Sequence, residues 1–147
     1  MLLIIGYGNT LRSDDGVGKV VVERLEAKRP SADLQFLACH QLLPEHAELV
    51  SQADRVIFID AAAGAPPGAI AVRELTAVSE DNPALIHDIT PQTLLAYAQL
   101  LYGRAPEAYL ITVNGYSFAY GDSLTKEMTA VLPKLLFQVV ESIGDLN

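Results

Sequence analysis

The sequence predicts an α/β fold with three layers, in which a mostly parallel twisted sheet of about five strands carries helices on both faces. Two observations support this class. Short apolar runs alternate with stretches of helical periodicity along most of the chain. The 147 residues, half of them apolar and without a shift in composition, also match one domain, 1–147, with a core of its own.

Each predicted strand is a short, mainly apolar run bounded by turn residues, as expected for strands buried on both faces of a parallel sheet. The run at the N-terminus, for example, ends at Gly6. In chain order the predicted strands are Leu2–Ile5, Leu34–Cys39, Arg55–Ile59, Ala69–Arg73 and Ala108–Val113.

Helices are expected between most of these strands. Ser13 is the expected N-cap of the first, whose apolar face carries Val17, Val20, Val21 and Leu25. Thr90 is the expected cap of another, with Pro91 at its first position. A third helix is expected within Pro44–Gln52, and the last apolar pattern runs from Leu124 to Ile143. Pro133 interrupts that pattern, which predicts a kink or a break.

Charge and composition exclude several classes of partner. The net charge is −8 and the Lys and Arg residues are scattered, so no basic stripe is available for nucleic acid. The apolar run before Gly6 is far too short for a membrane span or a signal peptide, so no membrane partner is expected. A single cysteine, Cys39, excludes an internal disulfide and favours the reducing cytoplasm.

A glycine-rich turn follows the first strand and partly resembles a dinucleotide-binding fingerprint. After Gly6 and Gly8, the third glycine of that fingerprint would fall at position 11, where the chain has Leu11. The spacing therefore argues against a bound nucleotide. A purely structural turn remains an alternative for these glycines.

Polar residues from three separate connections are expected to meet at the carboxyl edge of the sheet, where ligands of open α/β sheets bind. Asp14 and Asp15 follow the first strand, Asp60 directly follows the third, and His87 precedes the helix capped by Thr90. Each has a structural alternative: an acidic residue stabilises a helix N-terminus, and a lone histidine is often a cap or a surface residue. A carboxylate at the end of a buried strand needs a partner or a metal.

The string Gly6-Tyr7-Gly8-Asn9-Thr10-Leu11-Arg12-Ser13-Asp14-Asp15-Gly16-Val17-Gly18 resembles the N-terminal signature of the nickel–iron hydrogenase maturation endopeptidases. The similarity continues in order along the chain. It includes the strand that ends in Asp60, the segment His87-Asp88-Ile89-Thr90-Pro91, and Gly121-Asp122-Ser123-Leu124 before the last helix.

This resemblance implies an endopeptidase that trims the C-terminal extension of a hydrogenase large-subunit precursor after nickel insertion. It assigns Asp15, Asp60 and His87 as the catalytic and metal-contacting residues, and it identifies the metal as nickel already carried by the substrate. Two carboxylates and one imidazole form an oxygen and nitrogen set that suits a divalent ion. Some relatives have glutamate at the position of Asp15, which leaves open whether Asp14 contributes.

Substrate-contacting residues are expected where the second strand reaches the same edge. His40 and Gln41 follow that strand and could contact the tail of the precursor, although a polar turn before the helix at Pro44 is an equally good interpretation. No serine lies in a Gly-x-Ser-x-Gly turn, and Cys39 has no identifiable base. Attack by water, with a carboxylate as base, is therefore expected.

Two other functions remain open from the residues alone. One is an ordinary metallopeptidase that holds its own zinc on the same three side chains. The other is a nickel-handling checkpoint protein that binds the precursor without cutting it. Tight stoichiometric metal in the free protein would favour the first, and an uncut precursor would favour the second.

Overall fold

The computed structural model describes residues 1–28, 32–77 and 89–145. Strands and helices alternate along most of this length. In chain order they are β1 (Leu2–Tyr7), the 3₁₀ turn η1 (Ser13–Gly16), α1 (Val17–Lys28), β2 (Leu34–Cys39), the 3₁₀ turn η2 (Pro44–His46), α2 (Ala47–Gln52), β3 (Arg55–Ala62), β4 (Ile70–Leu75), α3 (Pro91–Tyr102), β5 (Glu107–Asn114) and α4 (Lys126–Asp145).

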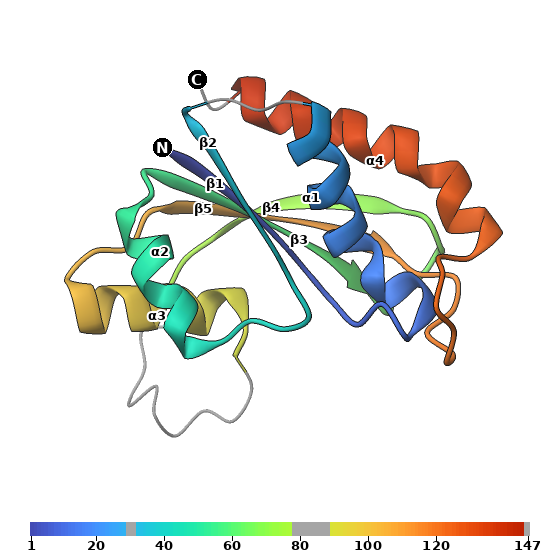
Figure 1. The fold of residues 1–147 in the computed structure, drawn as a ribbon, viewed down its shortest axis with the longest axis horizontal. Helices are drawn as coiled ribbons and strands as arrows, with labels where there is room; N and C mark the ends of the chain where they lie inside the picture. Colours follow the sequence, from blue (N-terminus) through green and yellow to red (C-terminus); the bar gives the residue numbers. More distant parts are fainter. Residues whose placement is uncertain (29–31, 78–88, 146–147) are drawn as a thin grey trace.

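The strands form one sheet in the order β2-β1-β3-β5-β4. The first four in this order are parallel, while β4 pairs antiparallel with β5 and closes one edge. Helices α1 and α4 cover one face of the sheet, and α2 and α3 cover the other (Figure 1). The predicted three-layer, mostly parallel α/β fold is confirmed.

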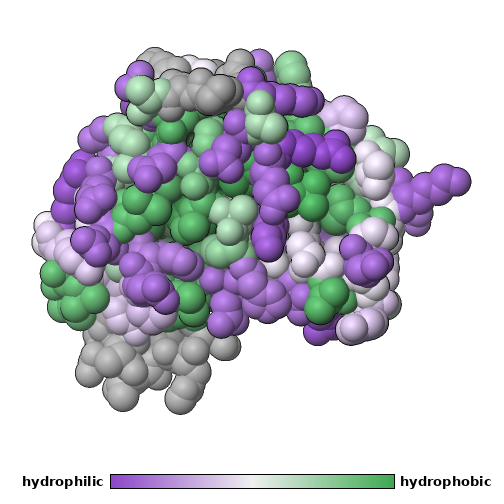
Figure 2. Space-filling model, in the orientation of Figure 1, coloured by the Kyte–Doolittle hydropathy of each residue, from purple (hydrophilic) through white to green (hydrophobic). Residues whose placement is uncertain are grey.

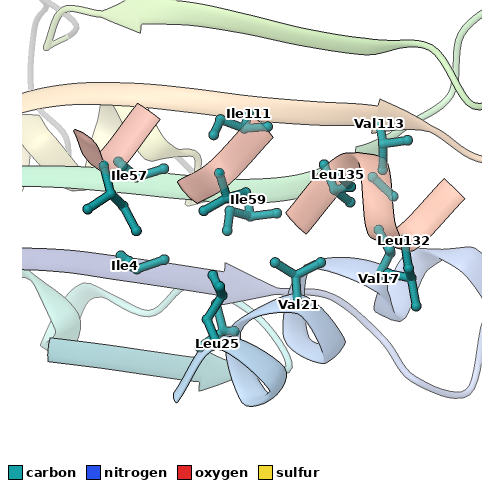
Figure 3. Packing of buried hydrophobic residues seen from close by; sticks show 14 of the residues in the cluster. Ile4, Val17, Val21, Leu25, Ile57, Ile59, Ile111, Val113, Leu132 and Leu135 are labelled. Atoms are coloured by element: carbon teal, nitrogen blue, oxygen red, sulfur yellow. The ribbon is translucent and has the colours of Figure 1, made fainter. Parts of the chain in front are cut away.

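Alternation along the strands divides the core into two apolar layers. In β3, Ile57 and Ile59 pack toward α1 and α4, whereas Val56 and Phe58 pack toward α2 and α3. Figure 3 shows the first layer, in which side chains from the sheet meet Val21 and Leu135 of the two helices. All of these side chains are fully buried. The central strands are therefore held from both faces.

The outer strands differ from the prediction that every strand is buried on both faces. Most of β4 is exposed, and β2 is only half-buried along its length, because a strand at the edge of the sheet has one neighbour. Figure 2 shows hydrophobic side chains gathered across the middle of the face that β2 crosses. A continuous apolar run alone does not distinguish an edge strand from a central one.

The helix ends confirm one predicted cap and correct another. Thr90 Oγ1 accepts a hydrogen bond from the Thr93 N–H (3.2 Å), and Pro91 begins α3, as expected. Ser13 is not an N-cap: it begins η1 with a φ of +52°, and its hydroxyl donates to the Ala119 carbonyl (2.8 Å).

Of the expected kink or break at Pro133, the break does not occur: α4 continues through this residue to Asp145. Pro133 has no N–H to donate to the carbonyl four residues earlier in the helix. Because Pro133 is exposed, water can bond to that carbonyl instead. Within residues 1–28, 32–77 and 89–145, none of the helices has the length and apolar character that crossing a membrane requires.

Candidate active site at the carboxyl edge of the sheet

The turn after β1 holds Asp15 at the carboxyl edge of the sheet. The backbone N–H of Asn9 donates to Asp15 Oδ2 (2.8 Å), and the Asp15 side chain stays half-buried. Gly8 has a φ of +150°, and a Cβ at that position would lie 1.9 Å from the Asp15 carbonyl oxygen. Only glycine fits this turn. The glycine motif therefore has a structural role that positions a carboxylate.

Gly6 and Gly18 allow α1 to pack against the end of β1. A Cβ on Gly6 would lie 2.0 Å from the Gly18 carbonyl oxygen, so any side chain would push the helix away from the strand. Close contact places the turn that carries Asp15 over the ends of the central strands. The glycines thus account for the geometry without any phosphate.

Asp14, next to the half-buried Asp15, is fully buried. Its carboxylate accepts hydrogen bonds from the N–H groups of Tyr116 (2.8 Å), Ser117 (3.2 Å) and Thr125 (2.8 Å). The Thr125 hydroxyl adds a fourth donor at 3.0 Å. Asp14 therefore anchors the segment before α4 and does not contribute an open oxygen to the candidate site.

Asp60 lies within β3, beside Thr112 of β5, and not after the strand as predicted. The strand continues because residues 60–62 keep their pairing with β5. Burial raises the pKa of the Asp60 carboxyl to about 6, against a hydrogen bond from the Tyr7 side chain that lowers it. The neighbouring charge of Asp15 adds to the increase.

Tyr7 is the last residue of β1 and shares a hydrogen bond with Asp60. Burial and the nearby carboxylates raise the pKa of its hydroxyl far above the usual value, so Tyr7 remains a neutral donor. Like Leu3 and Ile5, Tyr7 packs toward α2 and α3, which is also the side of Cys39. Phe58 takes the same side in β3, and the two-residue period places Asp60 there as well.

The other predicted site residues are divided between exposed positions and the undescribed segment. His40 and Gln41 follow β2 and are both exposed. His87 lies outside the described residues. Among the residues that the structure does describe, no group of three His, Cys, Asp or Glu side chains is arranged to hold a metal ion.

Comparison with known proteins relies on structure. No family model matches the chain, and no curated protein matches it. Among solved structures, the chain is similar to the hydrogenase maturating endopeptidase HybD from Escherichia coli, with 25% identity and a TM-score of 0.78 over 99% of this chain and 93% of that one.

The chain resembles the hydrogenase maturation proteases over almost its whole length. It is accordingly a peptidase. Two further structures share the fold: the NiFe hydrogenase maturation protease HycI from Thermococcus kodakarensis, with 21% identity and a TM-score of 0.75 over 95% of this chain and 90% of that one, and a hydrogenase 2 maturation peptidase from a Thaumarchaeota archaeon, with 22% identity and a TM-score of 0.72 over 97% of each chain.

Sequence reasoning about this peptidase missed Tyr7, although a signal for it was present. Tyr7 lies between the two glycines of the turn, and strand alternation from Leu3 and Ile5 places it on one face of the sheet. The pairing of Gly6 with Ile59 then sets Tyr7 beside Asp60. That register depends on the assembled sheet, so the contact was not visible in the sequence.

Proposed function

We propose that this peptidase removes the C-terminal extension of a nickel–iron hydrogenase large-subunit precursor, in the cytoplasm, after nickel has been inserted. The observation that carries the proposal is the placement of Asp15 and Asp60. Both half-buried carboxylates lie at the carboxyl edge of the sheet, close enough for the charge of Asp15 to raise the pKa of Asp60. Such a pair favours a partner that brings positive charge.

Nickel carried by the precursor would supply that charge. Ionising both carboxylates in the empty site is costly, and a divalent ion relieves the repulsion, so binding of a nickel-loaded precursor is favoured over a nickel-free one. His87 precedes α3, the helix that covers the sheet face shared by Tyr7 and Cys39. The imidazole of His87 is the third member of the proposed ligand set of Asp15, Asp60 and His87.

Hydrolysis would proceed by attack of water on the peptide carbonyl. An ionised Asp60 can accept the proton of that water, and a pKa of about 6 suits a general base near neutral pH. Tyr7 donates to Asp60 and so fixes the direction of its carboxylate. Cys39 is a poor nucleophile because burial raises the pKa of its thiol.

His40 and Gln41 would contact the tail of the precursor. Both are exposed and follow β2, whose last residue, Cys39, pairs with Tyr7 at the same edge of the sheet. A tail crossing this edge toward Asp60 would pass over them. Their side chains can donate and accept hydrogen bonds to an extended peptide backbone.

The test presents metal-free enzyme with purified precursor, loaded with nickel or free of it, and follows the size of the precursor by mass spectrometry. We expect cleavage of the loaded form only, and none by Asp60→Asn or His87→Ala variants whose circular dichroism matches the wild type. Efficient cleavage of the nickel-free precursor, or one firmly bound zinc per enzyme chain, would instead support the ordinary metallopeptidase. A precursor bound but left uncut would support the checkpoint protein.

A further inference from the structure

Two loops beside the candidate site are joined into one rigid unit. Arg12 and Gly121 form a parallel backbone bridge: the Gly121 N–H donates to the Leu11 carbonyl (2.9 Å) and the Ser13 N–H to the Gly121 carbonyl (3.0 Å). Side chains add two further ties, from Arg12 Nε to the Phe118 carbonyl (3.1 Å) and from Ser13 Oγ to the Ala119 carbonyl (2.8 Å). The buried Asp14 carboxylate also connects the two loops through the hydrogen bonds that it accepts.

This unit exposes two large side chains on neighbouring backbone segments. Leu11 and Tyr120 precede the two bridged positions, and the Gly121 N–H donates to the Leu11 carbonyl, so the backbone segments that carry the two residues lie beside each other. Leu11 is 50% exposed and Tyr120 is 86% exposed. A preorganised apolar and aromatic pair of this kind is typical of binding surfaces.

The position of the pair relative to Asp15 limits what can bind there. The Leu11 N–H donates to Asn9 Oδ1 (2.9 Å), and the Asn9 N–H donates to Asp15 Oδ2 (2.8 Å), so the loop that displays Leu11 also holds the carboxylate. A folded protein that brings a peptide bond to Asp15 therefore comes close to this loop. A short free peptide would not need to.

We propose that Leu11 and Tyr120 form the docking surface for the folded body of the precursor, with an apolar patch of that protein on Leu11 and a hydrogen-bond acceptor for the Tyr120 hydroxyl. This inference rests on the proposed function. Because the two loops are already held together, docking loses little loop freedom, and the precursor is oriented with its tail at the carboxylates.

Kinetics of precursor cleavage test the surface. We expect the Leu11→Ala/Tyr120→Ala double variant to raise KM about 10-fold while kcat stays within about twofold, as for loss of an aromatic anchor that is remote from the reacting atoms. The matched control is Leu101→Ala/Tyr102→Ala, which removes the same groups from the end of α3. Leu101 and Tyr102 are 58% and 49% exposed. That control should cleave like the wild type.

Direct binding separates docking from chemistry. In an Asp60→Asn background, the loaded precursor should bind about 10-fold more weakly when Leu11 and Tyr120 are replaced. If the double variant loses its circular dichroism spectrum, the Tyr120→Ala single variant decides, because that side chain is almost wholly exposed.

Three results would overturn the docking proposal. The first is an unchanged KM, the second is an equal rise in the control, and the third is self-association of the enzyme that the substitutions abolish. If wild-type enzyme fails to shorten the loaded precursor, the proposed function fails, and docking fails with it. If the wild type cuts and the double variant cuts equally well, docking alone is wrong.

Discussion

Asp14 and Asp15 are neighbours in the sequence with opposite environments in the structure. Asp14 is fully buried and accepts hydrogen bonds from three backbone N–H groups and one hydroxyl. Asp15 is half-buried, accepts one backbone hydrogen bond from Asn9, and faces the carboxyl edge beside Asp60. One carboxylate therefore has its bonding capacity taken up by the protein, and the other retains capacity for a ligand.

This difference shows that one residue of an acidic pair can anchor the backbone while its neighbour serves the candidate site. The donors to Asp14 come from residues more than 100 positions away, so this side chain connects the N-terminal turn to the segment before α4. Asp15 is held by the same turn. A site carboxylate can stay partly unsatisfied only where its neighbours keep the backbone in place.

The largest expected effect is on folding, from Asp14→Asn. The new amide would set its own donors against the N–H groups of Tyr116, Ser117 and Thr125, leaving buried donors without acceptors. We expect a loss of about 4 kcal/mol in the free energy of unfolding, measured by urea denaturation. A variant with wild-type stability and no cleavage would instead make Asp14 a site residue and remove the contrast.

A substitution of Asp60 tests whether an ionised carboxylate at the carboxyl edge destabilises the folded protein. Its pKa rises from 3.8 to about 6 in the folded state, so the folded protein retains this proton where the unfolded chain has released it. Stability from this group is full below pH 3.8 and is lost as the pH rises through about 6. Metal-free Asp60→Asn should therefore gain about 3 kcal/mol over wild type between pH 3 and pH 7. A constant difference across that range would contradict the buried, ionised carboxylate.

Asp15→Asn is the counterpart of the first substitution. Its remaining carbonyl oxygen can still accept the Asn9 N–H, so stability should change by less than about 1 kcal/mol. Cleavage of the loaded precursor should fall about 100-fold, because the site loses one of its two charges. Unfolding curves and processing rates from the same preparation check both halves. Normal processing would show that Asp15, like Asp14, is structural.

The smallest effect is expected for Cys39→Ala. The half-buried side chain packs at the end of β2, and its truncation should lower the free energy of unfolding by about 1 kcal/mol. The rate of processing should stay at the wild-type level, and thiol alkylation should leave it intact. Loss of processing in a stable Cys39→Ala protein would replace attack by water with a thiol nucleophile.

The sequence by itself determined the elements and the edge at which the site lies. Apolar runs and helical periods identified all five strands and the helices between them, and Thr90 with Pro91 predicted the start of α3. These features depend on residues close in sequence. The glycine turn likewise indicated that an acidic residue would lie after β1. The sequence left open whether Asp14 contributes to the site together with Asp15.

Tertiary structure decided what each carboxylate does. The choice of Asp14 as the buried one depends on donors at Tyr116, Ser117 and Thr125, which arrive only when the C-terminal half of the sheet has formed. The contact of Tyr7 with Asp60 depends on the register between β1 and β3. Hydrogen bonds and desolvation act on distances in space, and local patterns contain no record of those distances.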